Sequence, residues 1–105
     1  MRDTAQRAAG FLKSIGSSHR LMILSLLMDG GTKTVTQLCD AIGARQSLIS
    51  QHLTRLRLDG LVQAIRRGHF VHYSLTDTPA RDIVGILHDH FRRDRSAGRE
   101  KRLGA

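Results

Sequence analysis

A run of small, hydrogen-bonding side chains lies near the middle of the chain, at the spacing of one helix face. The run begins with Gln46 and Ser47 and continues with Ser50 and Gln51 one turn later. Glutamine can form paired hydrogen bonds with the N6 and N7 atoms of adenine, and serine can bond several bases. A helix that carries these side chains outward has the chemistry to read base edges in a DNA major groove.

Other polar side chains flank this run and suit the DNA backbone. Thr54 and Arg55 lie one turn further along, where a phosphate or a guanine edge is the expected contact. Arg45 comes just before the run and is a candidate for a backbone phosphate. His52 falls between the inner and outer faces of the same helix, so two interpretations stay open for it: a phosphate contact and an internal hydrogen bond.

A second basic cluster surrounds a glycine turn. Arg66 and Arg67 come before Gly68, and His69 follows it. These side chains can contact phosphates or enter a minor groove, whose negative potential favours arginine. An ordinary charged hairpin is the alternative interpretation of the same pattern.

The positive charge of the chain is concentrated in two segments. The formal net charge of the 105 residues is +8. Residues 45–70 contain five arginines and one aspartate, and residues 92–105 also have a net charge of +4, whereas residues 71–91 have a net charge of −2. Because one of the two basic segments coincides with the predicted reading helix and hairpin, the charge pattern predicts a polyanionic partner.

Apolar periodicity predicts the elements that position these residues. The predicted helices cover residues 5–15, 19–29, 36–43, 46–58 and 79–92, and the predicted strands are Val62–Arg66 and Phe70–Leu75. A helix that can enter a groove, followed by a basic two-stranded hairpin, predicts a mostly helical α+β fold, a winged helix-turn-helix. Residues 1–91 would form this single domain, and residues 92–105 a basic, disordered tail.

Local signals set the expected ends of the helices. Ser18 and Thr36 are the predicted N-caps of the second and third helices. Gly43 fits the left-handed position that ends the third helix, and Asp59-Gly60 ends the fourth.

Composition excludes several classes of protein. One cysteine cannot form an intrachain disulfide, and no apolar run approaches the roughly 20 residues of a membrane span. The N-terminal residues lack the apolar core of a signal peptide, so a cytoplasmic location is expected. There is no nucleotide-binding loop, nucleophile elbow or paired-carboxylate site, so we expect neither an enzyme nor a cofactor.

Several short motifs, in this order and spacing, resemble the ArsR/SmtB family of bacterial transcriptional regulators. The carriers are His19-Arg20-Leu21, Ser50-Gln51-His52-Leu53, Leu56-Arg57, Gly60-Leu61-Val62 and Arg67-Gly68 with Val71, Tyr73 and Leu75. Within the family, the segments 8–12 and 46–53 resemble the NolR-like subgroup of rhizobial nodulation regulators. The resemblance implies a homodimer built on the first and last helices, and repression by binding double-stranded DNA at promoters. Two reading helices in one dimer would require an inverted-repeat operator.

Many members of this family respond to metals, and their ligand positions can be compared with this chain. Thr34 and Thr36 occupy the positions of a Cys-x-Cys pair, and hydroxyls replace thiolates poorly. At a second site Asp77 and His90 match, but Pro79 and Arg93 replace the other two ligands. We therefore expect no metal site, and a metal-responsive repressor using Asp77 and His90 remains the alternative.

Two further alternatives stay open. Persulfide-sensing relatives use two cysteines, on the second and last helices, and neither predicted helix has one here. Cys39 lies in the third helix, where a small buried thiol is the favoured interpretation and redox sensing the alternative. The fold would also suit a winged-helix module for RNA or protein contacts, which strong competition by RNA would reveal.

Overall fold

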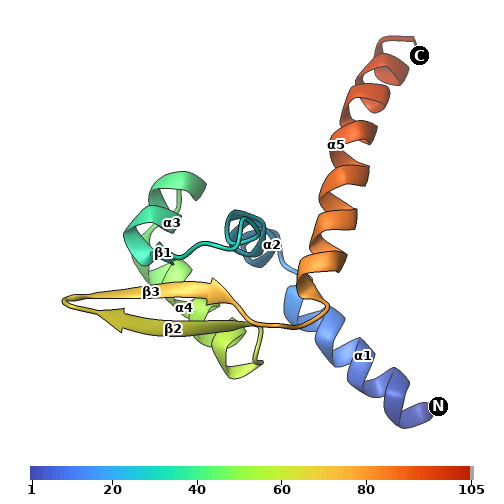
Figure 1. Ribbon diagram of the computed structural model, residues 1–105. Helices are drawn as coiled ribbons and strands as arrows, with labels where there is room; N and C mark the ends of the chain where they lie inside the picture. Colours follow the sequence, from blue (N-terminus) through green and yellow to red (C-terminus); the bar gives the residue numbers. More distant parts are fainter. Residues whose placement is uncertain (105) are drawn as a thin grey trace.

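The predicted apolar periodicity is realised in five helices, with the basic hairpin projecting beyond them. The computed structural model describes the backbone of residues 1–104 and the side chains of residues 1–92. The elements are α1 (Arg2–Ile15), α2 (Ser18–Leu26), β1 (Lys33–Thr34), α3 (Val35–Ile42), α4 (Gln46–Leu58), β2 (Val62–Arg67), β3 (Phe70–Leu75) and α5 (Ala80–Gly104). Helices α1 and α5 lie at one end of the molecule, and the β2–β3 hairpin reaches out at the other (Figure 1). The winged helix predicted from the sequence is therefore confirmed.

The sheet contains one strand that the sequence did not predict. The strands pair antiparallel in the order β1-β3-β2. In the hairpin, Val62 lies opposite Leu75 and Arg67 opposite Phe70. The short strand β1 adds two residue pairs, Lys33 with Tyr73 and Thr34 with His72. Two residues are too few to show the alternation by which a strand is recognised in a sequence.

The N-caps of two helices differ from the predicted residues. Ser17, not Ser18, caps α2: its backbone is extended and its hydroxyl accepts a hydrogen bond from the Arg20 amide at 3.4 Å. Thr34, not Thr36, caps α3, and it forms a reciprocal capping box with Gln37. The box satisfies two amides at once, which explains why the earlier threonine is used.

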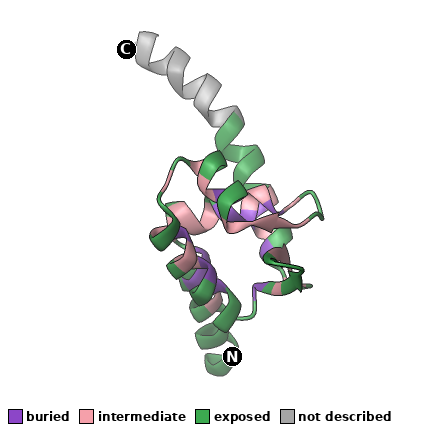
Figure 2. Cartoon of the chain, turned by 90° about the vertical axis from the view of Figure 1, so that its left-hand side faces the viewer, coloured by how far each residue is buried: buried purple, intermediate pink, exposed green. Residues whose placement is uncertain are grey.

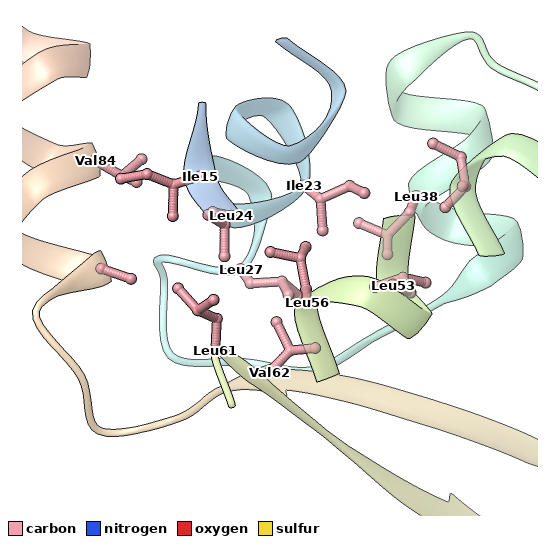
Figure 3. Packing of buried hydrophobic residues seen from close by; sticks show 12 residues of the cluster. Ile15, Ile23, Leu24, Leu27, Leu38, Leu53, Leu56, Leu61, Val62 and Val84 are labelled. Atoms are coloured by element: carbon pink, nitrogen blue, oxygen red, sulfur yellow. The ribbon is translucent and has the colours of Figure 1, made fainter. Parts of the chain in front are cut away.

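A single core joins the helices to the sheet, and α2 lies at its centre (Figure 3). Ile23 and Leu24 of α2 are fully buried, and so is Leu27, the residue that caps the C-terminus of this helix. They pack in one cluster with the buried residues of the other elements, which are Ile15, Leu38, Ile49, Leu53, Leu56, Leu61, Val62, Ala80 and Val84. Helix α4 and the first residue of β2 both contribute to this close-packed core. The core therefore fixes the position of the reading helix relative to the base of the hairpin.

Helix α5 is longer than predicted. The sequence predicted a helix over 79–92 and a disordered tail over 92–105, whereas the backbone is helical from Ala80 to Gly104. The basic segment contains arginine, lysine, glutamate and alanine, which are strong helix formers even without apolar periodicity. The predicted disordered tail consists almost entirely of residues 93–105, and the side chains of these residues lie outside the described part of the chain.

Large apolar side chains remain exposed on α1 and α5. Leu12 is 53% exposed, Ile86 69% and Phe91 60%. Exposed residues cover the N-terminal part of α1 and much of the described part of α5, while buried residues gather in the middle of the body (Figure 2). No helix within the described residues is both long and apolar enough to cross a membrane.

Candidate nucleic-acid interface

The reading helix α4 follows α3 after a tight turn. Gly43 ends α3 in the left-handed conformation with φ 79°, as predicted, and the chain is extended at Arg45 before α4 begins at Gln46. Helix α4 buries Ile49, Leu53 and Leu56 against the core, which turns its other side outward. Its first residues therefore project from the molecule in the way a recognition helix requires.

The predicted base-reading side chains share the outer face of α4. Gln46, Ser47 and Gln51 are exposed, and Ser50 is half-buried. The Thr54 hydroxyl donates to the Ser50 carbonyl oxygen at 2.9 Å. Within the part of the chain whose side chains are described, Gln46, Ser47 and Gln51 make no side-chain hydrogen bond, so their donors and acceptors are available to a ligand.

The two predicted arginines of this region differ in how firmly they are held. Arg45 is exposed and forms no side-chain cap on α4, so its guanidinium is available at the start of the helix. Arg55 donates from Nε to Asp59 Oδ2 at 3.1 Å. The pairing orients Arg55 along the C-terminal half of the helix and leaves its terminal nitrogens for other contacts.

The hairpin presents the second predicted cluster at its tip. Arg66 and Arg67 end β2, and Gly68 turns the chain with φ 64°. Both arginines and His69 are exposed. The sequence interpretation missed Phe70, which is 63% exposed beside this tip. The exposure of Phe70 could have been predicted from the sequence, because an aromatic residue beside a solvent-facing glycine turn is too far from the core to pack into it.

A partly buried arginine, Arg20, holds His52 and was not predicted as part of the site. Arg20 donates from Nε to His52 Nδ1 at 3.2 Å and from Nη1 to the Ser14 carbonyl oxygen at 3.0 Å. The His19 ring stacks on the His52 ring with centroids 5.5 Å apart. Of the two interpretations of His52, the geometry supports the internal hydrogen bond. Burial, and then the charges of Arg20 and His19, lower the pKa of His52.

A carboxylate at the end of α4 ties this helix to α1. The buried Ser14 hydroxyl donates to Asp59 Oδ2 at 2.6 Å. This hydrogen bond, followed by the hydrogen bond and charge of Arg55, lowers the pKa of Asp59 against the opposing effect of burial. Asp59 is therefore ionised at neutral pH and bridges two helices.

Three side chains that the sequence analysis considered for a metal or redox site, those of Thr34, His90 and Cys39, make other contacts in the structure. No cluster of three or more histidine, cysteine or acidic side chains suited to a metal occurs among the described residues. The Thr34 hydroxyl is engaged in the capping box of α3. His90 packs edge-on against Phe91, with ring centroids 4.9 Å apart. Cys39 is half-buried and packs against the core, in keeping with a small apolar side chain.

A reading helix after a tight turn, held beside an exposed basic hairpin, defines the winged helix-turn-helix class of DNA-binding proteins. The family model described as "Bacterial regulatory protein, arsR family" matches residues 17–64, from the cap of α2 into β2. The nodulation protein NolR of Rhizobium meliloti is 36% identical over 101 residues, which cover 96% of this chain and 82% of that protein. The chain belongs to the arsR family, whose members are DNA-binding transcriptional regulators and not enzymes.

Solved structures of relatives share the fold. The transcriptional activator HlyU of Vibrio cholerae is 34% identical over 84% of this chain and 81% of its own length. Its reduced form superposes with a TM-score of 0.81 at 33% identity, covering 87% of this chain and 95% of that one. NolR from Sinorhizobium fredii superposes with a TM-score of 0.77 at 33% identity, over 86% of this chain and 89% of its own. These likenesses agree with the NolR-like resemblance noted in the sequence.

Proposed function

We propose that this protein is a sequence-specific repressor that binds double-stranded DNA as a homodimer at an inverted-repeat operator. The observation that carries the proposal is the outer face of α4. Gln46, Ser47 and Gln51 are exposed there without internal hydrogen bonds among the described residues. Buried polar groups in a complex must be paired, so these amides and hydroxyls discriminate between bases that do and do not match them.

The hairpin and the flanking arginines supply the second component, backbone affinity. Arg66, Arg67 and His69 project at the tip of the hairpin, and Arg45 lies next to the start of α4. Phosphates are identical at every base pair, so these contacts add affinity and orientation without sequence information. Helix α4 would therefore recognise the base sequence, and the hairpin would bind the phosphate backbone.

The exposed apolar residues of α1 and α5 support a homodimer. Leu12, Ile86 and Phe91 are each more than half exposed, and they lie on the two helices at the end of the molecule opposite the hairpin (Figure 1). Burying such side chains against a second copy is favourable by about 25 cal/mol per Å² of apolar surface. A two-fold axis at this end would present two α4 helices to one face of DNA, about 34 Å apart.

Repression would follow from occupancy. A dimer bound across two successive major grooves covers the face of the duplex that RNA polymerase must reach, in the cytoplasm where the DNA lies. The relative HlyU is named a transcriptional activator, so the name of a relative does not give the sign of regulation for this chain. For this chain we propose repression.

Selection from a random duplex library tests the proposal. The bound fragments should share an imperfect inverted repeat whose half-sites are centred about one helical turn apart. Sedimentation of the complex should give two protein chains per duplex. Bound fragments without a shared motif, or competition by RNA as strong as by duplex DNA, would instead favour a winged-helix module for RNA or protein contacts.

A further inference from the structure

A basic groove between α1, α2 and α4 includes Arg55 of the predicted DNA contacts and extends beyond them onto α1 and α2. Its volume is about 810 Å³. The charged and titratable side chains lining it, among the described residues, are Arg7, Lys13, Arg20, His52, Arg55 and Asp59. Four permanent cations thus face a single carboxylate. A concave surface with this imbalance attracts anions, because its low-dielectric walls focus the field of the cations.

The single carboxylate is already engaged. Asp59 Oδ2 accepts hydrogen bonds from Ser14 Oγ at 2.6 Å and from Arg55 Nε at 3.1 Å. Among residues 1–92, no ion pair involves Arg7, Lys13 or Arg20. The groove therefore has positive charge that the described side chains do not neutralise.

Two hydrogen bonds hold the Arg20 guanidinium in position and leave part of its hydrogen-bonding capacity unused. Its Nε and Nη1 donate to His52 and to the Ser14 carbonyl oxygen, which fixes the plane of the guanidinium. Its Nη2 makes no hydrogen bond to the described part of the chain. A planar guanidinium held at Nε and Nη1 can present its Nη2 to an oxyanion at little cost in side-chain entropy.

His52 can add a neutral donor. Because its Nδ1 accepts the hydrogen bond from Arg20, a neutral ring must carry its proton on Nε2. Burial and the neighbouring charges lower the pKa of His52, so the neutral form prevails at neutral pH. The ring then donates from Nε2 while it orients Arg20 through Nδ1.

The position of the groove indicates which anion it meets. His52 and Arg55 line it from α4, and they neighbour Gln51 and Thr54 of the reading face in the same helix. A helix lying in a major groove has a phosphate backbone along each of its sides. The flank of α4 that faces α1 would therefore lie beside one of these two backbones.

We propose that this groove is a phosphate-binding site, built on Arg20 and Lys13, that takes a backbone phosphate beside the reading helix. This inference rests on the proposed function and extends the contact surface from α4 and the hairpin onto α1 and α2. It assigns Arg20 a binding role in addition to its internal hydrogen bonds. Inorganic phosphate has the same chemistry, and a test must distinguish the two sources.

The test uses the full chain and a duplex of random sequence, so that its outcome does not depend on sequence recognition. Affinity is measured at several chloride concentrations for wild type, Lys13→Gln, Arg20→Gln and the control Arg2→Gln. Arg2 is an exposed α1 arginine that does not line the groove. Losing one phosphate contact should lower the slope of log affinity against log salt by about 0.9 in Lys13→Gln and Arg20→Gln. Arg2→Gln should change the slope much less.

Lys13→Gln keeps the test decisive if Arg20→Gln fails to fold, because Lys13 makes no side-chain hydrogen bond or ion pair with the described residues. In parallel, inorganic phosphate is titrated into the free protein while the NMR signals of the His52 ring are followed. A saturable shift that Lys13→Gln abolishes is expected. Unchanged salt slopes with phosphate binding retained would assign the groove to a free anion and overturn the DNA contact. Unchanged slopes without phosphate binding would overturn the site itself.

Discussion

Ser14 of α1 and Asp59 at the end of α4 are joined by a 2.6 Å hydrogen bond across 45 residues of sequence. The hydroxyl is buried, and the carboxylate also holds Arg55. The helix that carries the proposed dimer contacts is thereby linked to the helix that carries the proposed base contacts.

Removing this hydrogen bond should destabilise the protein. A hydrogen bond to a charged group contributes about 1.5–3 kcal/mol, and partial exposure of Asp59 reduces this, so we expect Ser14→Ala to lower the free energy of unfolding by about 1 kcal/mol. Urea unfolding of Ser14→Ala, Asp59→Asn and the double variant checks the coupling. Strictly additive losses would show that the two side chains do not interact in solution.

The pair formed by Arg20 and His52 predicts a dependence of stability on pH. The pKa of His52 is lowered in the fold by burial and by the charges of Arg20 and His19. The unfolded chain therefore takes up a proton first, at its ordinary pKa of about 6.5. The stability that neutral His52 contributes is complete above that pKa and is lost as the pH falls through the lower folded pKa.

His52→Gln isolates this contribution, because an amide oxygen can accept from Arg20 but does not titrate. Urea midpoints measured from about pH 7.5 to about pH 5 should fall less steeply for His52→Gln than for wild type. Parallel curves for the two proteins would mean that His52 has the same pKa in the folded and unfolded chains.

Most of the scaffold could be predicted because its signals are local. Helix α4 has the bounds predicted from its apolar spacing, Gln46–Leu58, and Gly43 ends α3 as expected. The outer face of α4 follows from the same periodicity, so the exposure of Gln46, Ser47 and Gln51 could be inferred without a structure.

What could not be predicted depends on contacts between distant segments. Strand β1 exists because Lys33 and Thr34 pair with β3, about 40 residues later. The bond from Arg20 to His52 joins residues 32 positions apart. Periodicity shows which face of a helix is buried but does not show which polar side chain of another helix lies opposite, so the groove on α1 and α2 was not expected.

The exposed apolar residues of α1 and α5 predict the effect of a charge at the proposed dimer interface. Leu12→Asp and Ile86→Asp should each convert the dimer to a monomer, because an unpaired charge cannot be buried against apolar side chains. Leu58→Asp is the matched control, since Leu58 is 75% exposed but belongs to α4. Sedimentation velocity distinguishes the states, and a monomeric wild type would contradict the interface.

Metals should have little effect on DNA binding. Of the four ligands that metal-responsive relatives use at the site on the last helix, only Asp77 and His90 are present in this chain. At the other site, a threonine replaces each cysteine, and the hydroxyl of Thr34 is engaged in a capping box. Stoichiometric zinc, nickel or cadmium should therefore change operator affinity by less than about tenfold, or about 1.4 kcal/mol. A larger release of DNA that His90→Ala abolishes would restore the metal-responsive alternative.

The central claim, that α4 reads base sequence while the hairpin holds the backbone, is tested most directly by comparing Gln51→Ala with Arg67→Ala. Each variant is measured on the selected operator and on random duplex at several salt concentrations, with Gln6→Ala and Arg2→Ala on α1 as controls. Gln51→Ala should lose about 1–3 kcal/mol on the operator and little on random DNA. Arg67→Ala should weaken both and lower the salt slope by about 0.9. Equal losses on both DNAs for Gln51→Ala, or a loss confined to the operator with an unchanged slope for Arg67→Ala, would contradict this assignment.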